Sequence, residues 1–173
     1  VLRLCTPEHD LILMGLLQNL FMAASVWLLT RSVARKFALP FWGQVLLVLM
    51  QVFPHLLIKY FSAMSIFITN SVMSEALAFP LFTLWTMNIL ELLWEGKRRN
   101  AVGTLVLSIL LSLTRGQMMV TILIFFLVEL YRIIFVFQKK KLLISVLGLV
   151  LLVAAAFGIR TLTMRCYNLA VHG

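Results

Sequence analysis

Charged residues are scarce in this sequence, and acidic residues are the scarcest. Only 12% of the residues are charged, and 15 Lys and Arg stand against 6 Asp and Glu, whereas soluble proteins have about 25% charged residues. Hydrophobic residues make up 62% of the chain, and the mean hydropathy is +1.05. This composition excludes an ordinary water-soluble domain.

Cysteine, histidine and catalytic motifs are also sparse. Cys5 and Cys166 form no CxxC pattern and the three histidines are isolated, so neither a disulfide framework nor a zinc site is indicated. The sequence contains no nucleotide-binding glycine motif, GxSxG, HExxH or glycosidase-type carboxylate pair. No cofactor is evident, and a divalent metal is neither indicated nor excluded. Because Val1 is not an initiator and no signal peptide precedes the first apolar run, we expect a fragment of a longer protein.

Long apolar runs are what the sequence has in quantity. A helix needs about 20 apolar residues to cross a hydrocarbon core about 30 Å thick. The runs predict an all-α, polytopic transmembrane helix bundle that forms a single domain over residues 1–173. The predicted spans are residues 11–30, 41–58, 71–93, 101–113, 117–137 and 142–158, with a mixed tail from residue 159.

Residues 101–137 are too long for one span, because a single helix of that length would measure about 55 Å. Thr114, Arg115 and Gly116 interrupt the run and predict a reversal there, which makes the fourth span short. Two prolines lie inside other spans. We expect Pro54 to break the second span near its end and Pro80 to kink the third.

Basic residues are distributed unequally between the two sides of such a bundle. Ten of the 15 fall on one side, in the clusters 31–36, 97–99 and 132–141, and the other side keeps Arg3, Lys59, Arg115, Arg160 and Arg165. The positive-inside rule makes the first side cytoplasmic, with the loops Lys97–Arg99 and Lys139–Lys141. Because apolar runs of spanning length separate the clusters, they indicate membrane anchoring and no nucleic-acid partner.

Glu75 and Arg115 are lone charges beside long apolar runs on the other side. Ionisable groups at membrane depth are costly and usually face a cavity, a partner or a functional path. Ser74 adjoins Glu75, which places a hydroxyl and a carboxylate at one end of the third span, and arginine suits bidentate recognition of phosphate or carboxylate. The pattern leaves two interpretations open. These residues form a substrate site, or Glu75 and Arg115 form an ion pair whose role is limited to helix packing.

The order of these features resembles the GT-C glycosyltransferases. The resemblance covers residues 11–137. It rests on an Arg-rich turn after the first span (Leu28 to Lys36), a Pro-containing second span, Ser74-Glu75 at the start of the third, a basic turn, and a short span ending in Leu113-Thr114-Arg115. It implies an integral-membrane enzyme of the bacterial plasma membrane, similar to protein mannosyltransferases and aminoarabinose transferases. Such an enzyme transfers a sugar from a polyprenyl-phosphate-linked donor to an acceptor on the extracytoplasmic side.

The resemblance also implies residue roles. Ser74, Glu75 and Arg115 match substrate-binding positions of the family, and Arg160 and Arg165 become candidate contacts of the donor phosphate. The acidic catalytic motif of the family follows its first span, and no residue here matches it, so we expect the catalytic acid to lie outside this fragment and the fragment alone to be inactive. The implied partners are membrane lipid and the lipid-linked donor, with the acceptor unknown.

Two other classes stay open at this point. An O-antigen polymerase or ligase also has many spans and outer-face arginines. A non-enzymatic permease or transporter segment is the second alternative, although transport favours discontinuous helices with a site at the membrane midplane. Here the polar residues gather at one face, which favours chemistry at the membrane interface.

Overall fold

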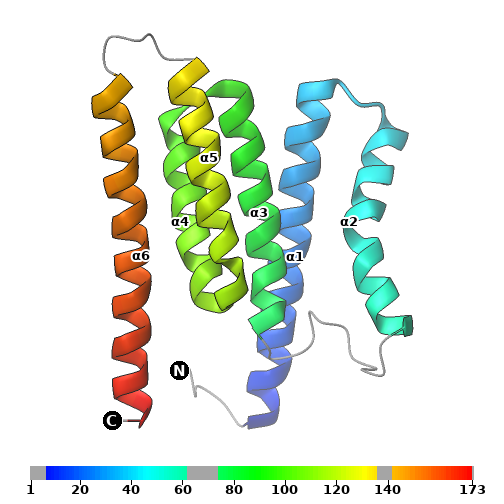
Figure 1. Cartoon of the computed structure of the whole chain (residues 1–173). Helices are drawn as coiled ribbons and strands as arrows, with labels where there is room; N and C mark the ends of the chain where they lie inside the picture. Colours follow the sequence, from blue (N-terminus) through cyan, green and yellow to red (C-terminus); the bar gives the residue numbers. More distant parts are fainter. Residues whose placement is uncertain (1–6, 62–73, 136–141, 173) are drawn as a thin grey trace. The chain divides into compact units, whose positions relative to one another are not determined.

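The computed structural model is all-α, which confirms the predicted fold class (Figure 1). It describes residues 7–61, 74–135 and 142–172, and these ranges contain no strand. The helices are α1 (Pro7–Phe37), α2 (Phe41–Phe61), α3 (Ser74–Glu95), α4 (Arg98–Thr114), the short 3₁₀ helix η2 (Gly116–Met119), α5 (Val120–Phe135) and α6 (Leu142–His172). Each of the six predicted spans overlaps one of these α-helices.

The chain divides into two compact units at Met87 and Asn88, within α3. In the N-terminal unit, α1 and α2 run antiparallel and pack against each other. In the C-terminal unit, which contains the last turns of α3, helices α4, α5 and α6 all contact one another. The hydrophobic core of the C-terminal unit is formed by Leu92, Phe125, Ile133 and Leu149.

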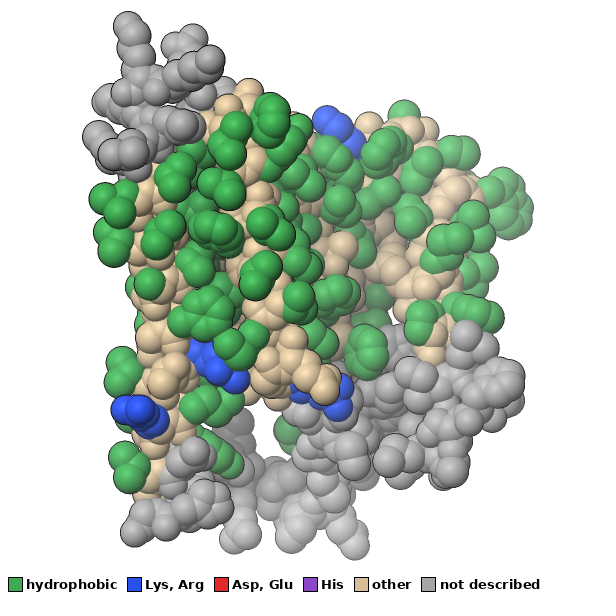
Figure 2. Space-filling model, viewed as in Figure 1, with side chains coloured by type: hydrophobic (Ala, Val, Ile, Leu, Met, Phe, Trp, Pro, Cys, Tyr) green, Lys and Arg blue, Asp and Glu red, His purple; other side chains and the backbone are tan. Residues whose placement is uncertain are grey.

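Four segments are long and apolar enough to cross a membrane. They are Leu13–Phe37, Leu77–Glu95, Gly116–Phe135 and Ser145–Tyr167, and Phe41–Pro54 is a shorter apolar segment. Hydrophobic side chains dominate the visible surface of the described helices, and the basic side chains seen there lie near the top and in the lower part of the view (Figure 2). A surface of this kind is stable against lipid and not against water. These are the helices of a membrane protein.

Several helix ends differ from the prediction. Helix α1 continues to Phe37, beyond the predicted end at residue 30, and α6 continues to His172, so the tail predicted as mixed is helical. Hydropathy marks only the apolar part of a helix, whereas helical hydrogen bonding continues through residues such as arginine and lysine, which have good helix propensity. Residues 62–73 and 136–141, including the Lys139–Lys141 loop, lie outside the described residues.

The prediction for Pro54 is wrong, because α2 continues past it to Phe61. A proline removes one backbone donor, and a membrane helix tolerates this loss where the rest of the ladder is intact. Pro80 likewise lies inside α3, with its side chain fully buried.

A polar stripe on α4 brings this helix close to α5. Asn100, Thr104, Ser108 and Ser112 recur every fourth residue and are all buried. The hydroxyls of Thr104 and Ser108 donate to the backbone carbonyls of Asn100 and Thr104, and the Ser108 hydroxyl also approaches the carbonyl of Thr121 on α5 at 3.3 Å. Small side chains let helix backbones approach closely in membranes. The stripe therefore explains how α4 packs closely against α5.

Candidate functional site

The predicted reversal at Thr114–Gly116 is confirmed. Helix α4 ends at Thr114, Arg115 has an extended backbone (φ −144°, ψ 128°), and η2 begins at Gly116. The N–H of Arg115 donates to the carbonyl of Leu111 at 3.0 Å, and the carbonyl of Arg115 accepts from the N–H of Met118 at 2.9 Å. The backbone of Arg115 is thus held on both sides, and its side chain is half-buried at the tip of the α4–α5 hairpin.

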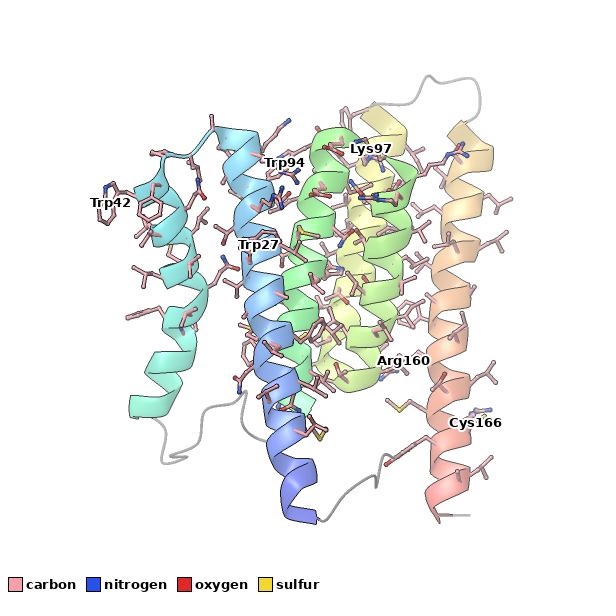
Figure 3. All side chains as sticks on the ribbon, turned by 180° about the vertical axis from the view of Figure 1, so that it is seen from behind. Trp27, Trp42, Trp94, Lys97, Arg160 and Cys166 are labelled. Atoms are coloured by element: carbon pink, nitrogen blue, oxygen red, sulfur yellow. The ribbon has the colours of Figure 1, made fainter. Side chains whose placement is uncertain are left out.

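Arg160 reaches the same tip from α6. Its Nε donates to the carbonyl of Ser112 at 3.3 Å, and its Nη2 lies 3.6 Å from the position that a Cβ on Gly116 would occupy. Figure 3 shows Arg160 pointing from α6 toward the hairpin, at the end of the C-terminal unit away from Lys97. The last carbonyls of a helix lack partners within the helix and carry partial negative charge. A guanidinium against the last turn of α4 is therefore favourable.

Arg165, the other predicted phosphate contact, is placed differently. It follows Arg160 by five residues on α6, so the two side chains leave the helix about 140° apart. Arg165 is exposed, and no contact among the described residues links it to the hairpin tip. The structure therefore separates two arginines to which the sequence assigned the same role.

Ser74 and Glu75 are the first two residues of α3 and belong to the N-terminal unit. Their side chains lie outside the described residues. The Glu75–Arg115 ion pair and the shared substrate site therefore both stay predictions.

A buried ion pair lies at the other end of the C-terminal unit. Arg132 of α5 is 7% exposed. It donates through Nη1 to Glu129 Oε1 at 2.5 Å and through Nη2 to the carbonyl of Gly96 at 2.6 Å. Gly96 has a φ of +66° in the turn between α3 and α4. From the sequence, Arg132 was placed in the cytoplasmic cluster 132–141, and this ion pair was not predicted. A signal for it was present, because Glu129 and Arg132 are three residues apart in an apolar run and therefore share one face of a helix.

The two ends of the C-terminal unit differ in charge. Its acidic residues in the described ranges are Glu91, Glu95 and Glu129, and all three belong to the end near Gly96, where Glu95 pairs with Lys97 at 2.8 Å. The hairpin tip instead carries Arg115 and the guanidinium of Arg160. A guanidinium attracts an anion more strongly where the local dielectric is low than it does in water.

Among the described residues, no group of three or more His, Cys, Asp or Glu is placed to hold a metal ion. No protein-family model, curated protein or solved structure matches the chain. The candidate site is therefore the arginine-bearing tip of the α4–α5 hairpin, defined here as Ser112 to Gly116 together with Arg160.

Proposed function

We propose that this chain is part of an integral-membrane glycosyltransferase that transfers a sugar from a polyprenyl-phosphate-linked donor to an acceptor on the extracytoplasmic side. The hairpin tip carries this proposal. It holds Arg115 at one end of a unit whose described acids belong to the other end, and Arg160 of α6 packs against the same tip. A lipid-linked sugar phosphate is an anion that meets a membrane protein at this depth, and arginine matches phosphate geometry.

The lengths of α4 and α6 support a position of the hairpin tip near one edge of the hydrocarbon core. Helix α4 has 17 residues and spans about 25 Å, less than a hydrocarbon core of about 30 Å. Helix α6 continues past Arg160 to His172, a length of about 18 Å, and it extends beyond the hairpin tip (Figure 1). The positive-inside rule orients the unit with Lys97, Arg98 and Arg99 toward the cytoplasm. In this orientation the tip faces the outer edge of the hydrocarbon, where we expect the donor phosphate to lie while its polyprenyl tail stays in lipid.

The chemistry at such a site follows from charge. A carboxylate takes the proton of the acceptor hydroxyl as the oxygen attacks the anomeric carbon. The bond between that carbon and the phosphate oxygen breaks, and polyprenyl phosphate leaves with added negative charge. A fixed cation stabilises this charge most in the transition state, which is the role of Arg115.

Arg115→Ala in the full-length protein tests the proposal. The rate of transfer of labelled sugar from a polyprenyl-phosphate donor, measured in membranes or proteoliposomes, should fall about 100-fold or more. This is the usual cost of losing one preorganised hydrogen-bond donor that stabilises charge in the transition state. Arg115→Lys should keep part of the rate because it keeps the charge but not the bidentate geometry.

Arg99→Gln provides a matched control, because Arg99 is an exposed cation at the other end of the same unit. Its transfer rate should stay within about twofold of the wild type, since surface substitutions away from a site have small effects. Near-normal turnover by Arg115→Ala, at normal membrane insertion, would remove Arg115 from the mechanism. If the wild type itself releases no polyprenyl phosphate, the transferase is excluded and the permease alternative gains support.

A further inference from the structure

Arg160 donates a hydrogen bond to a backbone carbonyl in the last turn of α4. Its Nε donates to the carbonyl of Ser112, three residues before Arg115. The preceding carbonyl, that of Leu111, accepts both the N–H of Arg115 at 3.0 Å and the hydroxyl of Thr114 at 2.8 Å. The last turn of α4 is thus tied to Arg115 from within and to α6 from outside.

We propose that Arg160 is a positioning residue that holds the hairpin tip so that Arg115 faces the anion. It acts through the hydrogen bond of its Nε to the Ser112 carbonyl, and its positive charge is secondary. This inference rests on the function proposed above and differs from the role implied by the family resemblance, in which Arg160 contacts the donor phosphate directly.

The hairpin tip needs such a contact because its own backbone hydrogen bonds hold it weakly. Arg115 is a single extended residue between α4 and a four-residue 3₁₀ helix, η2, and short 3₁₀ segments have poor hydrogen-bond geometry. A misplacement of about 1 Å at a reacting centre can cost about 100-fold in rate. The hydrogen bond from Arg160 to the Ser112 carbonyl, here called the brace, links α6 to the last turn of α4 and limits such movement. It requires a hydrogen-bond donor at the Nε position more than it requires a full positive charge.

Side-chain lengths make the two roles separable. The Nε2 of glutamine is the fourth atom from the backbone Cα, as the Nε of arginine is, so Arg160→Gln keeps a donor at nearly the same place and removes the charge. Arg160→Met has a similar stem and no donor. Arg160→Lys keeps the charge and moves the donor one atom further along the side chain.

Transfer kinetics in the full-length protein give the first test. With a positioning role, Arg160→Gln keeps kcat within about twofold, and Arg160→Met lowers kcat about fivefold or more, as the loss of one hydrogen bond predicts. In an Arg115→Ala background, Arg160→Met causes no further loss, because residues that act through each other are not additive. Equal losses in the Gln and Met variants, with the rate kept by Lys, would overturn positioning and favour a direct phosphate contact.

A second measurement does not depend on the enzyme activity. Gln117 is exposed on η2, and a Gln117→Cys probe, with Cys5 and Cys166 replaced by serine, reports the order of the tip through its rate of maleimide labelling in detergent. Arg160→Met should raise this rate about threefold or more, and Arg160→Gln should leave it unchanged. Arg99→Gln controls for the loss of one positive charge.

The two measurements separate the two proposals. If labelling responds as expected while the wild type transfers no sugar, the brace stands and the proposed function fails. If labelling and transfer are both unchanged in Arg160→Met, the positioning role is wrong, whatever the reaction. Size-exclusion profiles of the Met and Gln variants establish that both are folded before either is interpreted.

Discussion

Replacing Arg132 with methionine should remove the polar link between α5 and the α3–α4 turn. The Arg132 side chain is 8% exposed and its partner Glu129 is 13% exposed, so both charges lie away from solvent. Arg132 also donates to the carbonyl of Gly96 at 2.6 Å. Methionine fills much of the same volume, so the variant isolates the loss of charge and donors from the loss of packing.

The magnitude follows from what the substitution leaves behind. Removing one partner of a buried ion pair costs about 3–5 kcal/mol, because the other charge stays buried without compensation. A double variant, Glu129→Leu with Arg132→Met, removes that orphaned carboxylate. It should then lose only the bond to Gly96, about 1.5–3 kcal/mol for a bond from a charged donor. The double variant is therefore expected to be more stable than Arg132→Met alone.

Unfolding in mixed micelles, by titration with sodium dodecyl sulfate and followed by circular dichroism, measures these free energies. Arg98→Met is the matched control, because Arg98 is an exposed cation beside the same turn and its removal should change the free energy of unfolding by less than about 0.5 kcal/mol. The reasoning is refuted if Arg132→Met unfolds as the wild type does. It is refuted equally if the double variant is as unstable as the sum of the two single variants, since that result means no coupling.

Two glycines offer further tests of the C-terminal unit, both by the same unfolding measurement. Gly96→Ala should lower the free energy of unfolding by about 1–2 kcal/mol, because its φ is +66° and a Cβ there would lie 3.0 Å from Arg132 Nη2. Gly148→Ala is the control and should be neutral or stabilising, because nothing lies within 4 Å of its Cβ. An equal loss in both variants would contradict the role of the turn. Gly103→Ala should lose about 1–3 kcal/mol, because a Cβ would lie 2.7 Å from Asn88 Oδ1. Adding Asn88→Ala should restore part of that loss, and no recovery would show that the contact is not the cause.

The candidate site was partly readable from the sequence. Arg115 stood out because a charge and a glycine interrupt an apolar run too long for one span, and the structure confirms the reversal there. Arg160 and Arg165 could not be told apart by the same reasoning. Which of them meets the end of α4 depends on how α6 is rotated and shifted against the hairpin, and this is a property of helix packing. The pairing of Arg132 with Gly96, 36 residues away, was hidden for the same reason.

The sequence by itself determined that the described residues are helical, how the six α-helices among them are divided and where the α4–α5 hairpin turns. The physical reason is local: within hydrocarbon each backbone N–H and C=O must be bonded inside its own segment, so apolar runs become helices and polar breaks become turns. Only the tertiary structure decided which charges are buried and which carbonyls they hold. Arg132 on Gly96 and Arg160 on Ser112 are contacts between helices, and their formation depends on how whole helices pack, which no local pattern encodes.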